Sequence, residues 1–267
     1  MVSPRRLIAL DIDGTLVNEF GHASPQVREA VRDAIEAGHE VMLATGRSPS
    51  QTFPVAAMLG LQSKYLVCSN GAMVYEADPV AVDGYSPVRV ETFDPSVLID
   101  AVEQRLTEHA FAVEDEDGIM HHTAGFPEQA ARGVLTETAR LRELTATRLV
   151  VVSHGERMDD MLAVAAENGL HRSHYSVGLW SWLDIAPRGV NKATALEWVR
   201  QQLDVPRESI IAIGDGENDI EMLEYAAGGG GLGVAMGHCA PEVAEVANEQ
   251  TGLVEDGVAQ ILRKYAE

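Results

Sequence analysis

The sequence predicts an α/β protein with a parallel-sheet core that is interrupted by an inserted α+β unit. The apolar run Leu7–Leu10 is continuous, as strands buried on both faces of a parallel sheet are. Strand-like and helix-like segments then alternate until the rhythm changes near residue 80, and the alternation resumes at Asn191. We therefore expect a core formed by 1–81 and 185–267, with 82–184 as a separate inserted domain.

The core elements follow from local signals. Ser24-Pro25 is a helix start, with an N-cap residue and proline at the first helical position, and Gly38 stands where a C-terminal glycine belongs. The other core elements expected are strands at Leu7–Leu10, Glu40–Ala44, Tyr65–Cys68 and Ile210–Ile213, and helices at 48–59 and Asn191–Leu203. This order implies a parallel sheet with right-handed crossovers.

The inserted segment reads as strands mixed with helices. We expect strands at Val88–Phe93, Phe111–Glu114, Ile119–Thr123, Arg148–Ser153 and His174–Ile185, and helices near 95–109, 127–140 and 156–168. The acidic run Asp115–Gly118 lies between two strands and predicts a hairpin turn rather than a calcium loop.

Four aromatic or imidazole side chains of the insert are candidates for substrate contact: His121, His122, Trp180 and Trp182. The tryptophans alternate with Ser181 and so share one strand face, where packing inside the insert is favoured over a stacking platform. The adjacent histidines point to opposite faces, which argues against both binding one metal.

Charge excludes some partners. Lys+Arg 20 against Asp+Glu 41 gives a net charge of −21 and a pI of about 4.7. Such a field repels nucleic acid and anionic membranes, and the simplest reason for it is solubility. A phosphorylated substrate would also be repelled at long range, so an anion site here must be locally positive.

Composition also bounds the compartment. Cys68 and Cys239 lie far apart and outside any zinc-binding spacing, so neither a zinc site nor a disulfide framework is expected. Asp11 and Asp13 interrupt the apolar N-terminal run, which is unlike a signal peptide, and no stretch reaches the roughly 18 apolar residues of a membrane helix. We expect a cytoplasmic protein, monomeric or homodimeric.

Polar residues follow three core strands directly. These segments are Asp11–Thr15, Thr45–Arg47 and Gly214–Asp219, and a fourth, Lys192, opens the helix that returns from the insert. In open parallel sheets, ligands bind at the carboxyl edge of the strands, so these segments are expected to meet. Each alone has a plainer reading: a strand-end turn, a surface lysine, or acids favoured at a helix start.

Together these residues suit phosphoryl transfer. Asp11 can be the nucleophile, and Asp13 can act as general acid and then as base. The two carboxylates would crowd one side of the strand, a repulsion that Mg²⁺ bound by Asp11 and Asp215 would relieve. The remaining candidates supply donors around a phosphate or orient the lysine and the metal's waters: Thr45, Gly46, Lys192, Asn218 and Asp219, with Arg47 and Asn70 near enough to contact substrate.

These four segments resemble the signature motifs of the haloacid dehalogenase superfamily, most closely its Cof-type phosphatases with a C2-type cap. Three further segments match that branch: Ser69–Ala72, Val234–Gly237 and Asp256–Ala259. The resemblance implies a Rossmann-like core, an inserted cap and Mg²⁺-dependent hydrolysis of phosphomonoesters. It also implies Asp11 as nucleophile and metal ligand, Asp13 as acid/base and a ligand through its backbone carbonyl, and Asp215 as a direct ligand.

The expected function is Mg²⁺-dependent hydrolysis of a small phosphorylated metabolite through an aspartyl-phosphate intermediate. A sugar phosphate is the first choice of substrate, and a phosphorylated cofactor such as pyridoxal phosphate is the next. A phosphomutase on the same scaffold and a non-catalytic phospho-ligand-binding protein remain alternatives. The chain departs from the family at His238-Cys239, where asparagine often follows Ala-Met-Gly, and in the glycine run Gly228–Gly231.

Overall fold

The chain forms two compact units. The computed structural model describes residues 5–127, 133–154, 171–177, 180–252 and 256–265. One unit, the core unit, combines Met1–Val88 with Asn191–Glu267, and the other, the insert unit, is Arg89–Val190. These divisions fall seven and six residues later than the sequence suggested. The first is later because strand β5 (Tyr85–Val90) pairs in a sheet of the core unit.

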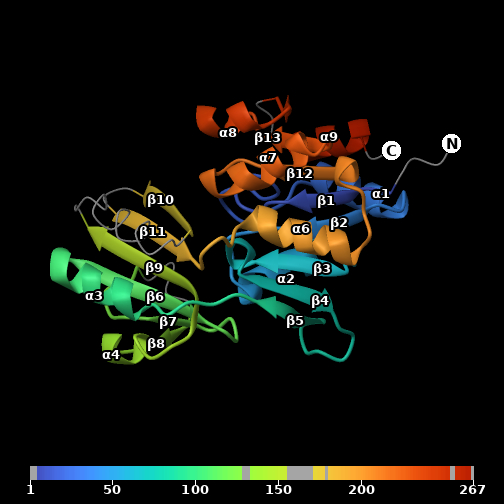
Figure 1. The fold of residues 1–267 in the computed structure, drawn as a ribbon. Coiled ribbons are helices and arrows are strands. Elements are labelled where there is room, and N and C mark those ends of the chain that lie inside the picture. The colour runs from blue at the N-terminus through green and yellow to red at the C-terminus, as the bar shows by residue number, and fades with distance from the viewer. Residues whose placement is uncertain (1–4, 128–132, 155–170, 178–179, 253–255, 266–267) are drawn as a thin grey trace. The chain divides into compact units, whose positions relative to one another are not determined.

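The core unit contains a five-stranded parallel sheet in the order β14-β13-β12-β1-β2. Its strands are β1 (Leu7–Leu10), β2 (Glu40–Leu43), β12 (Ile210–Gly214), β13 (Leu232–Ala235) and β14 (Glu249–Gln250). β1 lies between β12 and β2, with Leu10 paired to Ile213 on one side and Leu43 on the other. The expected parallel α/β core is confirmed (Figure 1).

A second sheet of three strands, β3 (Tyr65–Cys68), β4 (Met73–Ala77) and β5, continues the core unit. β3 and β4 are antiparallel, and a parallel bridge between Ala44 and Val67 places β3 beside β2. The helices of this unit are α1 (Pro25–Glu36), α2 (Pro49–Leu59), α6 (Lys192–Gln202), α7 (Ile220–Gly228), α8 (Pro241–Val246) and α9 (Gly257–Tyr265), with 3-10 turns η1 (Ser69–Gly71), η2 (Arg207–Ser209) and η3 (Glu217–Asp219).

Side-chain caps fix the starts of two helices, and the first of these caps, Ser24, was expected from the sequence. The Ser24 hydroxyl accepts a hydrogen bond from the Val27 N–H, which caps α1 just before Pro25. Asn191 caps α6 in the same way, and Thr194 bonds back to the Asn191 N–H. The second cap matters for the site because it fixes the backbone position from which the Lys192 side chain extends.

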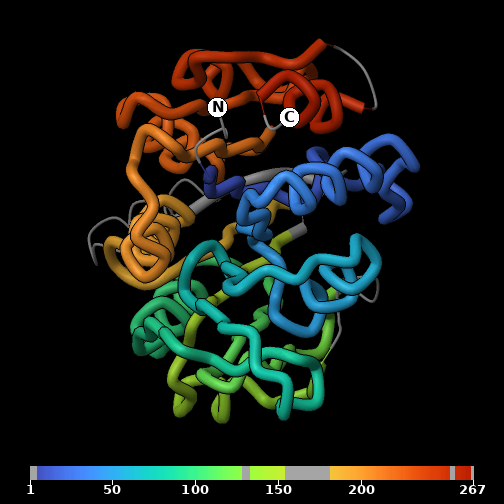
Figure 2. The backbone as a smooth tube through the Cα atoms, turned by 90° about the vertical axis from the view of Figure 1, so that its right-hand side faces the viewer, coloured from blue at the N-terminus to red at the C-terminus, as the bar shows by residue number. Residues whose placement is uncertain are grey.

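Every residue of β1 is buried, so side chains on both faces of this central strand are covered. Leu7 and Ala9 of β1 are fully buried in one cluster with Leu196 of α6 and Leu223 of α7. Figure 2 shows α1, in blue, beside α9, in red, so the first and last helices of the described chain pack together. No helix in the described part of the chain combines the length and apolarity needed to cross a bilayer.

The insert unit contains a mainly antiparallel six-stranded sheet in the order β10-β11-β9-β6-β7-β8. Its elements are α3 (Ser96–Arg105), β6 (His109–Asp115), β7 (Met120–His122), β8 (Val134–Leu135), α4 (Thr138–Leu141), β9 (Ala146–His154), β10 (His171–Val177) and β11 (Trp180–Ala186). The turn at Asp115–Gly118 is confirmed: the Asp115 N–H donates to the Ile119 carbonyl, and Gly118 has φ +76°.

Three predictions for the insert were wrong or displaced. His174–Ile185 is two antiparallel strands, β10 and β11, and the sequence pattern alone did not show where one ends and the next begins. Of the helix expected near 127–140, residues 128–132 lie outside the described part, and the residues after them hold the short strand β8 and the start of α4. The strand expected at Val88–Phe93 lies earlier, at β5, and Phe93 only bridges Ala146. The helix expected near 156–168 lies outside the described residues.

Of the four side chains proposed for substrate contact, the structure describes those of His121, His122 and Trp182, and all three have partners within the insert. Trp182 packs edge-on against Phe126, with ring centroids 5.6 Å apart, as expected for packing rather than stacking on a ligand. His121 contacts the Asp115 carboxylate at 2.8 Å, and the His122 ring lies near Phe126. The two histidines have separate partners, which agrees with their opposite directions on β7.

Candidate active site

The predicted polar segments meet at one edge of the core unit. Asp11 follows β1, and its N–H continues the ladder to the Ile213 carbonyl of β12. Thr45 follows β2 and donates its N–H to the Val67 carbonyl of β3. The carboxyl ends of these neighbouring strands therefore bring residues from distant parts of the sequence together, as the parallel order requires.

Lys192 is the centre of this arrangement. Its side chain is 0% exposed, and Nζ lies 2.7 Å from Asp11 Oδ1 and 2.7 Å from Asp219 Oδ1. The Asn191 cap starts α6 at this residue, so the side chain extends from the first turn of the helix into the cluster. Burial alone would lower the pKa of Lys192, but the carboxylates of Asp11 and Asp219 outweigh it and raise the pKa above its usual range.

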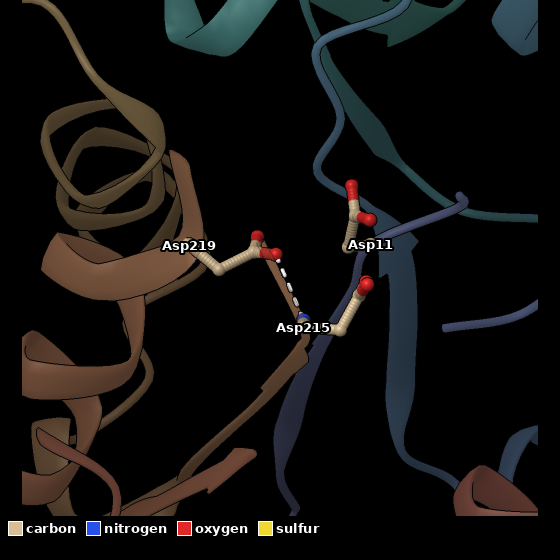
Figure 3. A group of neighbouring side chains, drawn as sticks. All are labelled: Asp11, Asp215 and Asp219. Atoms are coloured by element: carbon tan, nitrogen blue, oxygen red, sulfur yellow. Dashed lines mark hydrogen bonds between the residues drawn. The ribbon is translucent and has the colours of Figure 1, made fainter. Parts of the chain in front are cut away.

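Asp219 is fully satisfied by donors. One oxygen accepts from Lys192, and the other accepts the backbone N–H groups of Asp215 and Gly216, each at 3.0 Å. Figure 3 shows Asp219 reaching across to the Asp215 amide, with the carboxyl groups of Asp11 and Asp215 beside it. Asp219 thus shapes the loop after β12 and holds the lysine.

Asp215 is oriented from the opposite side. The Thr15 hydroxyl donates to Asp215 Oδ1 at 2.9 Å, and His238 Nε2 lies 3.5 Å from Asp215 Oδ2. Gly14 permits this approach, since its φ is +73° and a Cβ there would lie 2.2 Å from Asp215 Oδ2. Only glycine fits that position without displacing the carboxylate.

The cluster has an excess of negative charge. Asp11, Asp215 and Asp219 each place a carboxylate oxygen within 4.8 Å of the others, and Lys192 is the cation that contacts two of them. Burial raises the pKa of Asp11 to about 8, against the opposing effect of Lys192 and with further repulsion from Asp219 and Asp215. Burial also raises the pKa of Asp215, and the Thr15 hydrogen bond only partly offsets this.

These donors fit a hard divalent cation. Oxygen ligands from carboxylates are those that Mg²⁺ takes, and two positive charges would balance the buried excess. Asp11 and Asp215 are the residues suited to direct ligation, because both oxygens of Asp219 already accept hydrogen bonds from the protein. Within the described residues, no other group of His, Cys, Asp and Glu side chains meets the same distance limit.

Asp13 is placed differently from Asp11. Its side chain is 64% exposed and forms a two-pronged ion pair with Arg47: Nε to Oδ2 at 2.8 Å and Nη2 to Oδ1 at 2.6 Å. The hydrogen bonds to Asp13 raise the pKa of the Arg47 guanidinium, so it stays charged. Arg47, expected from the sequence only to contact substrate, thus holds the carboxyl group that is expected to transfer protons.

Gly46, Asn70 and Asn218 lie beside Thr45, and we call these four residues the polar wall. Asn70 Oδ1 accepts from Asn218 Nδ2 at 2.9 Å, and the Asn70 N–H donates to the Thr45 carbonyl. A Cβ on Gly46 would lie 3.0 Å from Asn70 Oδ1, so glycine there allows close approach to this pair. Asn70 holds φ +53°, a left-handed conformation that asparagine tolerates better than most residues.

Sequence reasoning did not assign roles to Thr15 and His238. Thr15 belonged to the Asp-x-Asp-Gly-Thr run, and its position four residues after Asp11 was an available signal. His238 was noted only as a departure from the family pattern. It reaches Asp215 because the chain just after β13 still lies beside the end of the parallel strand β12, where the Met236 N–H donates to the Gly214 carbonyl.

Comparisons with known proteins agree with this geometry. The family model described as haloacid dehalogenase-like hydrolase matches residues 8–262. The chain is 33% identical to pyridoxal phosphate phosphatase YbhA of Escherichia coli (strain K12), over 97% of this chain and 98% of that one. It is 30% identical to 5-amino-6-(5-phospho-D-ribitylamino)uracil phosphatase YitU of Bacillus subtilis (strain 168), over 97% of each.

The fold also matches a solved structure, that of TM0651 from Thermotoga maritima. The TM-score is 0.76 at 24% sequence identity, with 97% of each chain covered. The match extends over core and insert alike, so it supports the fold class read from the sequence. The chain therefore belongs to the haloacid dehalogenase-like hydrolases, and it is a phosphoric monoester hydrolase.

Proposed function

We propose that this protein hydrolyses small phosphomonoesters with Mg²⁺, through a phosphate ester of the Asp11 carboxylate. The observation that carries the proposal is the buried cluster of Asp11, Asp215 and Asp219 around Lys192. A fold gains nothing in stability from burying three carboxylates with one lysine, since unbalanced buried charge is costly. The arrangement suits a cation and a phosphoryl group instead.

In the first half of the reaction, an Asp11 oxygen attacks phosphorus and the ester P–O bond breaks. Lys192 keeps Asp11 oriented and offsets charge on the transferring oxygens. Asp13, protonated, gives its proton to the leaving alkoxide, which departs as the alcohol. Mg²⁺, when bound by Asp11, Asp215 and the Asp13 carbonyl, would supply Lewis-acid stabilisation of the phosphoryl oxygens.

In the second half, water replaces the alcohol. Asp13, now a carboxylate, takes a proton from that water as its oxygen attacks phosphorus. The bond between Asp11 and phosphorus breaks, and inorganic phosphate leaves with the Asp11 carboxylate restored. The exposed position of Asp13, in contrast to the buried Asp11, allows it to exchange its proton with solvent between turnovers.

The phosphate-facing donors are assigned to the polar wall. Thr45 is 1% exposed and accepts the Arg47 N–H at its hydroxyl, which fixes the Thr45 rotamer for donation to a phosphate oxygen. Gly46 offers a backbone N–H without a side chain in the way. Asn218 and Asn70, already paired with each other, would orient around the same group.

The substrate is proposed to be a small phosphorylated metabolite, read by the insert unit acting as a C2-type cap. The relatives above are named for pyridoxal phosphate and for a phosphoribitylamino-uracil, both compact phosphomonoesters. Sugar phosphates remain the first choice made from the sequence. Both classes belong in a test, because the core-unit residues assigned above would contact the phosphoryl group and not the rest of the substrate.

The test measures inorganic phosphate release from sugar phosphates, pyridoxal phosphate and flavin mononucleotide, with Mg²⁺ and with chelator. Asp11→Asn serves as the matched variant, because it keeps the shape of the side chain and removes the nucleophile. A second arm quenches the reaction in acid with labelled substrate and asks whether phosphate stays on the protein and is released by hydroxylamine.

Mg²⁺-dependent release that Asp11→Asn lacks, with label trapped on the wild-type chain, is the expected outcome. Label that moves to a second hydroxyl of the substrate without free phosphate would show a mutase instead. Release that persists in Asp11→Asn would remove the nucleophile assignment. Full activity in chelator would remove the metal from the proposal.

A further inference from the structure

The ion pair between Arg47 and Asp13 has a geometry that a simple phosphate contact does not need. Both carboxylate oxygens of Asp13 are taken by one guanidinium, at 2.8 and 2.6 Å. A two-pronged pair of this kind fixes the plane of the carboxyl group as well as its position. Asp13 is 64% exposed, so without Arg47 its side chain would be free to rotate in solvent.

Arg47 is itself held at both ends of its residue. Its N–H donates to the Thr45 hydroxyl at 3.1 Å, and its carbonyl accepts the Ser69 N–H at 2.9 Å. The Arg47 side chain is 25% exposed, far less than that of its partner. The rigid side of the pair is therefore Arg47, anchored to the ends of β2 and β3, and the adjustable side is Asp13.

We propose that Arg47 is a positioning residue for Asp13, which aims the acid/base carboxyl at the leaving oxygen, and not only a contact for the substrate. This inference rests on the proposed function, in which Asp13 donates a proton to the leaving group. Lysine at this position would keep the positive charge but lose the planar fork, because an ammonium group is a point donor.

The pair is compatible with both protonation states of Asp13. In the acid form, one oxygen carries the proton toward the leaving alkoxide while the other still accepts one N–H of Arg47. As the P–O bond breaks, the proton passes to the alkoxide, and the freed oxygen accepts the second N–H.

Leaving-group chemistry separates positioning from phosphate binding. An alkoxide needs a proton to leave, whereas p-nitrophenolate leaves as a stable anion. The test compares kcat/KM for glycerol phosphate and p-nitrophenyl phosphate in wild type, Arg47→Lys and Asp13→Asn. The ratio kcat/KM reports steps up to phosphoryl transfer to Asp11, so the later role of Asp13 as base does not enter.

We expect Arg47→Lys to lower kcat/KM roughly 10- to 100-fold for glycerol phosphate, a part of what a general acid contributes, and less than about threefold for p-nitrophenyl phosphate. Arg200→Lys is the matched control. Arg200 forms the same kind of fork with Glu197, at 2.8 and 2.7 Å, on the side of α6 that contacts Tyr225 of α7. Its replacement should change neither substrate's kinetics.

Equal losses for both substrates with a raised KM would show that Arg47 only binds phosphate, and no loss would show that it does neither. Either result overturns the inference while Asp13→Asn still discriminates between the substrates. If Asp13→Asn itself loses both activities equally, Asp13 is not the acid. The acid assignment in the proposed function then fails, and the positioning role fails with it.

Discussion

Replacing Lys192 with methionine is the sharpest test of how this site is held together. The ammonium group lies 2.7 Å from one oxygen of Asp11 and 2.7 Å from one oxygen of Asp219, with no solvent exposure. Methionine keeps most of the apolar stem and removes the charge. The metal-free variant would then contain a buried carboxylate at Asp219 with no cation in contact.

The expected magnitude follows from these distances. Unit charges 2.7 Å apart attract by about 6 kcal/mol at an effective dielectric constant of about 20. Desolvation of the ions cancels part of this, and removing one member of a buried pair typically costs about 3–5 kcal/mol. At about 2–4 °C per kcal/mol for chains of roughly this size, Tm should fall by roughly 6–20 °C.

The assay is thermal and urea unfolding of metal-free protein, followed by circular dichroism. Lys64→Met is the matched control, since Lys64 pairs with Glu76 at 3.5 Å with half of its side chain in solvent. We expect no measurable change in Tm there. If Lys192→Met alone does not fold, the double variant Lys192→Met/Asp219→Asn keeps the test open.

The double variant also removes the Asp219 charge, which Lys192→Met leaves buried without a cation in contact. It should therefore be more stable than Lys192→Met by roughly 0.5–3 kcal/mol, the usual coupling between members of one network. A Lys192→Met protein as stable as wild type, or a double variant whose losses simply add, would refute the account of Lys192 as the neutralising charge of a buried cluster.

Further predictions concern pH, metal and backbone. Because the pKa of Asp11 is raised from 3.8 to about 8 in the folded metal-free protein, the folded state holds a proton that the unfolded chain loses. The free energy of unfolding should thus fall as pH rises from about 4 to about 8, by up to roughly 5 kcal/mol shared among the coupled carboxylates, and Asp11→Asn should flatten that profile. Mg²⁺ should raise Tm more at pH 8 than at pH 6, as it competes with this proton; an equal shift at both pH values would contradict a site at Asp11. Gly14→Ala should lower Mg²⁺ affinity at least about tenfold, measured by titration calorimetry, because its Cβ would displace Asp215 and its φ of +73° adds about 1–2 kcal/mol of strain; unchanged affinity would exclude Asp215 as a ligand.

The sequence determined the core of this protein to a large extent. Continuous apolar runs, the Ser24-Pro25 cap and Gly38 specified local elements that form by short-range physics, and the structure has them at nearly the expected residues. Polar segments directly after β1, β2 and β12 were bound to meet, because parallel strands present their carboxyl ends at one edge. The family and the class of reaction followed from the same segments.

Tertiary structure decided which contacts those residues make with one another. Only the folded chain shows that Lys192 contacts both Asp11 and Asp219, and that the other oxygen of Asp219 accepts hydrogen bonds from two backbone amides. Arg47 pairs with Asp13 because the β2 and β3 ends fix its backbone, a constraint that no local pattern encodes. In the insert, β10 and β11 were taken for one strand, since both are strand-like in sequence and only their antiparallel pairing in space shows that they are two.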